Sequence, residues 1–201
     1  MIFFNQILPE LYVGTYPENS KDIRKLSTFC GVTAVLNLQT NEDLREKGLD
    51  WLSLEGTYGE FSVEIQRVPM RDFDYEDQRR VLPDAVRTLA KLLTSGHTVY
   101  LHCNAGVGRS PLVAMAYLYW YRGLGLSEAI RYVQLRRPCS PYEDLLEVGR
   151  QDLLQNEGIQ EQISRLAYEI SQQPMNDPVD PQIYREEAER KILKRFLDVE
   201  K

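Results

Sequence analysis

The feature that most constrains this chain is a short glycine-containing segment, "HCNAGVGRS" at residues 102–110, which lies between two apolar runs. The run before it, "TVYLHC" at 98–103, is rich in β-branched and aromatic residues and predicts a buried strand. The run after it, "PLVAMAYLYWYRGLG" at 111–125, predicts a helix. A loop between such a strand and helix lies at the carboxyl edge of an open α/β sheet, where these folds place ligands.

The residues of this loop suit an anionic ligand. Backbone N–H groups without a helical partner converge there with the positive end of a helix dipole, and such a place binds anions. The same field favours the thiolate of Cys103, which is the nucleophilic form. Gly106 and Gly108 permit the turns that bring amides close to a ligand, and Arg109 presents a planar two-pronged donor. Ser110 is placed to hydrogen-bond the sulfur when the sulfur becomes a leaving group.

We therefore predict phosphoryl transfer to Cys103, with His102 tuning the cysteine through hydrogen bonds and not acting as a base. A nucleotide P-loop does not fit, since the Lys-Ser/Thr pair is absent. A papain-like hydrolase would need a partner histidine, and only His97 could serve. A glycine turn with an incidental cysteine is the structural alternative. The predicted phosphate-binding residues are Asn104, Ala105, Gly106, Val107, Gly108 and Arg109.

The rest of the chain predicts an α/β fold with a small mixed sheet of about five strands flanked by helices. Apolar runs at 11–14, 32–38 and 64–70 read as further strands. Leu82, Val86, Leu89 and Leu93 recur at helical spacing, with Pro83 in a first turn and Gly96 as a stop, so a crossover helix precedes the strand of the loop. Later helices are expected over 127–137 and 140–155.

At 201 residues and 43% apolar content, the chain can bury one good core. We predict one domain over residues 1–157 and a helical extension over 158–201, with a proline-rich linker at 171–183. The last helix pairs opposite charges four residues apart and carries an apolar stripe. We expect it to dock on its own domain; the alternative is a partner contact or a homodimer. The stripe consists of Ala188, Ile192, Phe196 and Val199, and the charge pairs are Glu186 with Arg190 and Glu187 with Lys191.

The net charge of −6 argues against nucleic acid as a partner, because such binding rests on Lys and Arg that neutralise phosphates. Local basic clusters could still meet an anion, or be solvated surface. No window is apolar enough to span a membrane, and the start resembles no leader, so we expect a soluble, cytoplasmic protein. Three scattered cysteines and two histidines predict neither a disulfide framework nor a metal site, and we expect no cofactor. The basic clusters are Arg67, Arg71, Arg79 and Arg80, and Arg136 with Arg137.

The segment "HCNAGVGRS" resembles the active-site loop of the protein tyrosine phosphatase superfamily, whose pattern is His-Cys, five residues, Arg, then Ser or Thr. The length fits the dual-specificity class. Together with "RDFDYED", "YLYWYRG" and "RRPC", it resembles the glucan phosphatases, the group of laforin and the plant starch-excess enzymes, over residues 6–155. The resemblance implies the cysteine-phosphatase fold and hydrolysis of phosphate monoesters on phosphorylated α-glucan, starch-like or glycogen-like, through a phosphocysteine. The alternatives are a phosphatase for phosphoprotein or phosphoinositide, and an inactive phosphosubstrate-binding module.

The reaction also needs an acid to protonate the departing oxygen. "RDFDYED" offers Asp72, Asp74 and Asp77, and residue chemistry alone does not choose among them. Resemblance to the glucan phosphatases selects Asp72, with Asp74 as second candidate. The structural alternative is an acidic helix start, a role that suits Glu76 and Asp77 better.

Substrate recognition is expected from aromatic residues near the cleft. The stretch 48–61, which holds Trp51, Tyr58 and Phe61, is expected to form a variable loop beside the site. In the resembled family, Phe73 would face the substrate. Packing in the core is the alternative for each aromatic. The predicted substrate-binding residues are Phe73, Trp51, Tyr75 and Arg71.

The chain departs from the plant enzymes at four positions. Glu46 and Lys47 stand where those enzymes carry a pair of aromatics, and Ser140 stands where one plant form has phenylalanine. Asn37 occupies the place of a cysteine that forms a regulatory disulfide in some relatives. Redox control by that route is therefore not expected here.

Overall fold

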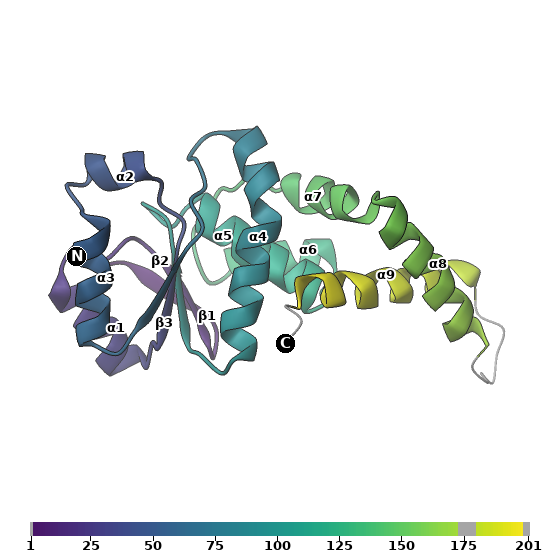
Figure 1. The fold of residues 1–201 in the computed structure, drawn as a ribbon, viewed down its shortest axis with the longest axis horizontal. Helices are drawn as coiled ribbons and strands as arrows, with labels where there is room; N and C mark the ends of the chain where they lie inside the picture. The colour runs from purple at the N-terminus through teal and green to yellow at the C-terminus, as the bar shows by residue number, and fades with distance from the viewer. Residues whose placement is uncertain (1, 173–179, 199–201) are drawn as a thin grey trace.

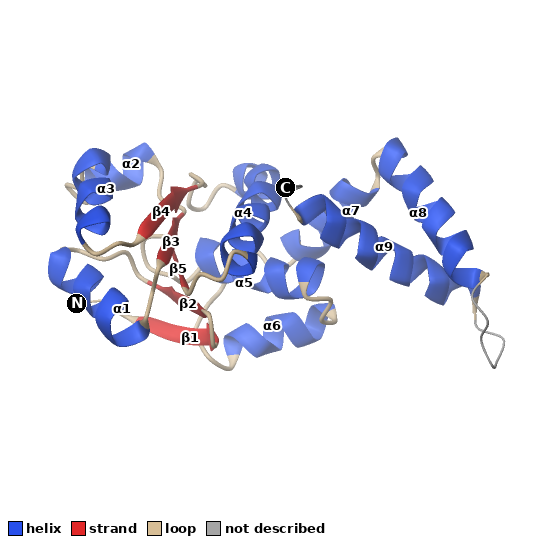
Figure 2. Cartoon of the chain, turned by 60° about the horizontal axis from the view of Figure 1, so that its bottom comes forward, coloured by secondary structure: helices blue, strands red, loops and turns tan. Residues whose placement is uncertain are grey.

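The computed structural model describes residues 2–172 and 180–198. Its centre is a five-stranded sheet with the order β1-β2-β5-β3-β4 (Figures 1 and 2). β1 pairs antiparallel with β2, and the other neighbours are parallel, so the mixed five-stranded sheet predicted from the sequence is confirmed. The strands are β1 (Phe4–Leu8), β2 (Leu11–Gly14), β3 (Ala34–Asn37), β4 (Glu64–Arg67) and β5 (Val99–His102).

Helices cover both faces of this sheet (Figure 2). Side chains of a strand alternate between faces, and β5 shows the consequence. Val99 and Leu101 lie in the larger core with α4 (Tyr75–Thr94) and α5 (Arg109–Ala116). Tyr100 lies in the smaller core on the opposite face, with side chains of α1 (Ser20–Cys30) and α3 (Trp51–Glu60). Burial on both faces explains why β5 reads as a continuous apolar run.

Two expected boundaries were wrong. The crossover helix begins at Tyr75 and not near Leu82, because the carboxylate of Asp74 caps its first turn. Pro83 therefore lies inside α4 and not in its first turn. The stretch 48–61, expected as a variable loop, folds largely into α3. The carboxylate of Asp50 accepts the amide of the third helical residue there, which is a local start signal for a helix.

The helix after residues 103–108 changes from α-helical to π-helical winding. α5 continues as a π-helical turn, η1 (Tyr117–Tyr121), before α6 (Leu126–Gln134) and α7 (Leu145–Leu154). Trp120 of η1 is buried, and its indole N–H donates to the carbonyl of Leu146 at 2.8 Å. This bond ties the π-helical turn to α7. α2 (Asn41–Glu46) is a short helix between β3 and α3.

The chain ends in a helical hairpin that projects from the domain (Figure 1). α8 (Glu157–Ser171) and α9 (Pro181–Leu197) bury a common apolar cluster. The carboxyl-terminal end of α9 lies against the domain: Leu197 is part of the main core, and the Tyr121 hydroxyl donates to Asp198 at 2.5 Å. Residues 181–183 were expected as the end of the linker, but they form the first turn of α9.

Part of the expected linker, residues 173–179, lies outside the described residues. Ala188 and Ile192 of the expected apolar stripe are buried, but Phe196 is 39% exposed and Val199 lies outside the described residues. Leu193 and Leu197 take the buried positions instead. Lys191 pairs with Glu187 as expected. No helix within residues 2–172 and 180–198 is long and apolar enough to cross a membrane.

Candidate active site

Residues 103–108, called the binding loop below, connect β5 to α5 at the carboxyl edge of the parallel strands, as the sequence predicts. Every carbonyl of residues 104–108 is hydrogen-bonded outward, to parts of the chain that surround the loop. The bonds are Tyr16 N to Asn104 O (3.1 Å), Arg137 Nη2 to Ala105 O (3.1 Å), Arg137 Nε to Gly106 O (2.5 Å), Ser140 N to Val107 O (2.9 Å) and Leu112 N to Gly108 O (3.1 Å).

Carbonyls that point outward leave the amides to point into the loop. In the described part of the chain, the amides of Ala105, Val107 and Gly108 donate to no protein acceptor. Backbone N–H groups that converge in this way form an anion-binding concavity, and the start of α5 adds the positive end of its dipole. The geometry therefore favours a ligand with several negatively charged oxygens.

Cys103 lies at the base of this concavity and is 2% exposed. Its sulfur accepts the Gly106 amide at 3.3 Å and lies 3.4 Å from the Ser110 hydroxyl. Gly106 has φ +66°, and a Cβ there would collide with the carbonyl of Gly14 and with Arg137. The loop conformation thus requires glycine at this position.

His102 precedes the cysteine and is 1% exposed. Its Nδ1 lies 3.1 Å from the carbonyl of Cys103, which can only accept, so Nδ1 carries the proton. Burial lowers the pKa of His102 to about 4, and the charge of Arg109 adds to this effect against the opposing hydrogen bond to Cys103. The ring is therefore neutral near pH 7 and faces a backbone carbonyl. This arrangement favours the predicted supporting role over that of a base.

The guanidinium of Arg109 lies fully buried beside the loop. Its Nη1 donates to Asp43 and to the carbonyl of Met70, each at 2.8 Å, and its Nη2 donates to Asp72 at 2.8 Å. Nε has no partner among the described residues. Burial alone would lower the pKa of Arg109, but the hydrogen bond to Asp43 and the nearby negative charges raise it. Arg109 thus stays charged, and its Nε N–H and the second N–H of Nη2 have no protein acceptor among the described residues.

The three candidate acids have different partners in the structure. Asp72 pairs with Arg109 and lies beside Gly108 of the loop, with its side chain 32% exposed. Asp74 accepts the Asp77 amide at 3.0 Å as the cap of α4, and Asp77 accepts the Arg71 amide at 2.7 Å. Asp74 and Asp77 are therefore engaged at the helix start, and the geometry favours Asp72 as the acid.

Asp43 is the residue of the site that sequence reasoning missed. It lies in the first turn of α2 and forms a reciprocal capping box with Thr40. Its other oxygen accepts the side-chain amide of Asn104 at 2.5 Å, so one carboxylate holds both Arg109 and the loop. Burial raises the pKa of Asp43, but the hydrogen bonds from Arg109, Thr40 and Asn104 outweigh burial and lower it. The spacing in "TNED" at 40–43 was the available signal, since it is that of a helix start.

Of the four predicted substrate-binding residues, Phe73 lines a small pocket at the loop. Phe73 is 87% exposed and adopts φ +55°, which is strained for a bulky residue. Tyr75 donates to Asp144 at 2.6 Å and packs edge-to-face on Tyr142. This pocket, of about 120 Å³, lies beside the acid. It is lined by Asp72, Phe73, Gln78, Gly108, Ser140, Pro141 and Tyr142.

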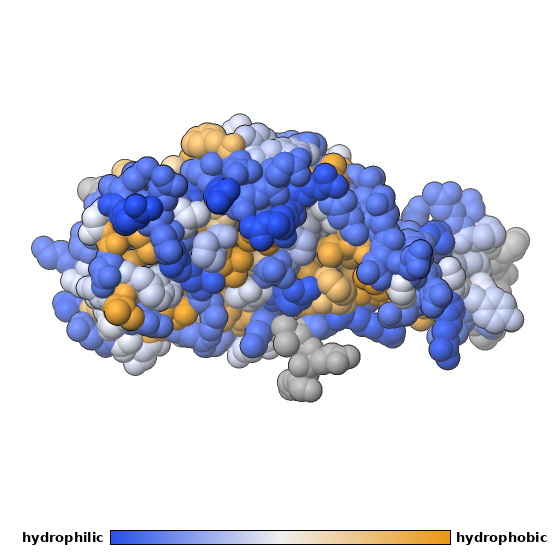
Figure 3. All heavy atoms as spheres, turned by 45° about the horizontal axis from the view of Figure 1, so that its top comes forward, coloured by the Kyte–Doolittle hydropathy of each residue, from blue (hydrophilic) through white to orange (hydrophobic). Residues whose placement is uncertain are grey.

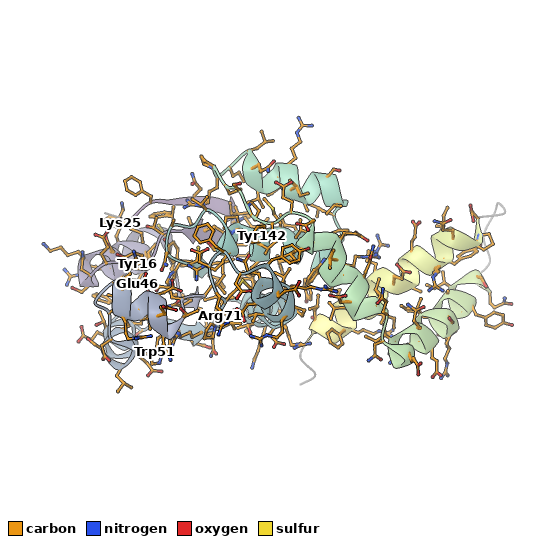
Figure 4. The ribbon with its side chains drawn as sticks, turned by 90° about the horizontal axis from the view of Figure 1, so that it is seen from above. Tyr16, Lys25, Glu46, Trp51, Arg71 and Tyr142 are labelled. Atoms are coloured by element: carbon orange, nitrogen blue, oxygen red, sulfur yellow. The ribbon has the colours of Figure 1, made fainter. Side chains whose placement is uncertain are left out.

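Other labelled side chains lie further from this pocket. In the view from above, Tyr16, Glu46 and Trp51 lie to the left of Arg71 and Tyr142 (Figure 4). Trp51 packs against Arg67, whose guanidinium lies 5.0 Å from the ring centroid. Figure 3 shows hydrophilic side chains over most of this face, with hydrophobic ones in small separate groups.

Two aromatics considered for the cleft pack elsewhere. Tyr58 is 1% exposed inside the smaller core, and Phe61 packs against that core beneath Arg24. For these two residues the packing alternative holds. Within the described residues, no group of three or more His, Cys, Asp or Glu side chains could hold a metal ion.

Comparison with known proteins places this site in context. The family model "Dual specificity phosphatase, catalytic domain" matches residues 11–164. The chain is 37% identical over 156 residues to the amyloplastic phosphoglucan phosphatase DSP4 of Castanea sativa, which aligns 76% of this chain and 41% of that protein. It is 32% identical over 166 residues to laforin of Mus musculus, which aligns 77% of this chain and 50% of that protein. The chain thus spans half or less of the length of these curated relatives.

Solved structures agree on the fold. The crystal structure of Tk-PTP in the active form gives a TM-score of 0.61 at 22% identity, covering 76% of this chain and 97% of that one. A kinase-associated phosphatase structure gives 0.62 at 18% identity, covering 78% and 97%.

The burial of His102 predicts a pH dependence of stability. His102 has a pKa of about 4 in the folded state, and a histidine in an unfolded chain has a pKa of about 6.5. At a pH between these two values, His102 therefore binds a proton only when the protein unfolds. Its contribution is therefore lost as pH falls from about 6.5 to about 4. Between pH 7.5 and pH 5, the free energy of unfolding of the wild type should fall by about 2 kcal/mol more than that of His102→Gln, measured by urea unfolding. Equal losses in both proteins would contradict the assignment.

Proposed function

Because this chain belongs to the dual-specificity phosphatase family, we propose that it hydrolyses phosphate monoesters through a phosphocysteine intermediate. The observation that carries this proposal is the loop of residues 104–108, whose carbonyls are all bonded outward around a buried Cys103. Amides that face inward would bind the three non-bridging oxygens of a phosphoryl group. Arg109 adds a charged donor at the same place.

In the first step, the thiolate of Cys103 attacks phosphorus, and the bond from phosphorus to the substrate oxygen breaks. The departing oxygen takes a proton from Asp72, which lies beside Gly108 on the open side of the loop. The inward amides and Arg109 stabilise the charge on the transferred group. The products of this step are a free alcohol and the phosphocysteine.

In the second step, a water molecule attacks the phosphorus of the phosphocysteine, and the carboxylate of Asp72 takes a proton from that water. The phosphorus–sulfur bond breaks, and the sulfur leaves as a thiolate. The Ser110 hydroxyl, 3.4 Å from that sulfur, is placed to donate to it as the charge develops. Inorganic phosphate is released, Cys103 is again a thiolate, and Asp72 is again protonated.

For the substrate, we favour phosphorylated α-glucan of the starch or glycogen type. Two curated relatives are a phosphoglucan phosphatase and laforin. Phe73 and Tyr142 border the pocket beside Asp72 and expose aromatic surface, on which sugar rings can pack. The strained, exposed placement of Phe73 costs free energy that a ligand contact would offset. A phosphoinositide would be favoured by basic side chains in the loop, and residues 104–108 have none.

The substrate is tested by phosphate release from solubilised amylopectin, phosphorylated glycogen, a phosphotyrosine peptide and a phosphoinositide at equal phosphate concentration. We expect kcat/KM for the glucans to exceed that for the peptide and the lipid at least tenfold. Cys103→Ser should abolish release from all of them. Greater turnover of the peptide or the lipid, with no glucan activity, would overturn the glucan assignment. No release from any substrate would leave only a phosphosubstrate-binding module.

The acid is tested by a matched pair of substitutions. Asp72→Asn removes the proton donor and should lower kcat for the glucan by about 100-fold or more. Asp74→Asn preserves the helix cap, because asparagine caps as well as aspartate, and should stay near the wild-type rate. Rates are measured with p-nitrophenyl phosphate and with the glucan, because an aryl leaving group depends less on the acid. The reverse order of the two variants would refute the assignment.

The role of Asp43 is tested by Asp43→Asn. The amide keeps the shape of the capping box but loses the ion pair that orients Arg109, so kcat should fall by about 10- to 100-fold. Asp50→Asn, at the cap of α3, makes the same chemical change away from Arg109 and serves as control. Melting temperatures of both variants are measured alongside. Equal kcat for both variants would show that Asp43 has no part in positioning Arg109.

A further inference from the structure

We propose that Arg137 is a positioning residue that holds the peptide groups of the binding loop in their anion-binding orientation. The proposal rests on the phosphatase function proposed above, because it assigns a role in the same site. Arg137 was noted in the sequence only as part of a basic cluster that could meet an anionic substrate. In the structure it lies behind the loop and is 5% exposed.

The contacts of Arg137 define this role. Its Nε donates to the carbonyl of Gly106 at 2.5 Å, and its Nη2 donates to the carbonyl of Ala105 at 3.1 Å. The two acceptors are consecutive peptides at the middle of the loop. When these carbonyls are held on the outside, the N–H groups of the same peptides, on Gly106 and Val107, lie on the inside. The first of them donates to the sulfur of Cys103 at 3.3 Å.

Arg137 differs from the other groups that hold the carbonyls of the loop. Asn104, Val107 and Gly108 are held through their carbonyls by the backbone amides of Tyr16, Ser140 and Leu112. A substitution at these three donors leaves the amide in place. Among the described residues, Arg137 is thus the one side chain on which the outward direction of the loop carbonyls depends.

The far side of the guanidinium is anchored as well. Nη1 of Arg137 donates to the side-chain oxygen of Asn5 in β1 at 3.0 Å. Arg137 therefore spans from the edge strand to the loop. It also closes the space that a side chain at position 106 would occupy, since a Cβ on Gly106 would collide with its Nη2.

The charge of Arg137 points to the same role. Within the described residues, no carboxylate forms an ion pair with Arg137, although the group is buried. A buried cation without a paired carboxylate is costly. An anion bound in the loop would lie on the other side of the two peptides that Arg137 contacts. Its negative charge would supply the missing compensation.

The test compares two neighbouring arginines. Arg137→Met removes the donors and the charge, and Arg137→Lys keeps the charge but loses the planar fork of donors that spans the two carbonyls. Arg136→Met is the matched control, because Arg136 is exposed, donates to the carbonyl of Tyr132 and stacks on its ring. For each protein, kcat and KM for p-nitrophenyl phosphate, tungstate affinity by calorimetry and the melting temperature are measured.

We expect kcat to fall about 100-fold in Arg137→Met and about 10-fold in Arg137→Lys, with weaker tungstate binding in both. Arg136→Met should match the wild type. If Arg137→Met does not fold, Arg137→Lys decides the question, because it retains the buried charge. A folded Arg137 variant with unchanged kcat and unchanged tungstate affinity would overturn the proposal, even if its melting temperature were lower. A wild type that neither turns over the aryl phosphate nor binds tungstate would instead overturn the phosphatase function.

Discussion

The site depends on one buried ion pair, between the Nη1 of Arg109 and the carboxylate of Asp43 at 2.8 Å. Arg109 belongs to the first turn of α5, and Asp43 to the first turn of α2. The same carboxylate accepts from Asn104, so the helix, the loop and the arginine are fixed relative to one another. A buried charge of this kind is tolerated only when it is well paired, and Arg109 is paired on two sides, by Asp43 and Asp72.

Much of the fold could be predicted from the sequence, because local patterns report local structure. The runs that became β2, β3 and β5 are rich in apolar, β-branched and aromatic residues, so their strand character is plain. β4 reads "EIQR" and is less apolar, and it was predicted as part of the longer run 64–70. β1 was missed because Asn5 and Gln6 interrupt its apolar pattern, as an edge strand permits. The start of α4 was placed too late because Pro83 suggested a first turn, although Asp74 caps the helix earlier.

The residues of the site also differ in how far the sequence predicts them. Cys103, Arg109 and Ser110 lie in one continuous segment, so their proximity follows from the sequence alone. Asp43 and Arg137 could not be assigned, because long-range pairing brings them to the loop. β3 and β5 are parallel neighbours with Asn37 opposite His102, which puts the segments after both strands side by side. That strand order cannot be predicted from a local sequence pattern.

The outward bonding of the loop also bears on how such a site tolerates change. Three of the five loop carbonyls are held by main-chain amides, which every residue except proline supplies. The side chains of Tyr16 and Ser140 can therefore vary without loss of these bonds, whereas Leu112 is fixed by its burial in the main core. Substitutions at positions 16 and 140, next to the loop, can alter which molecule is admitted while the phosphate-binding geometry stays intact. A scaffold built this way can acquire new specificities without first losing its chemistry.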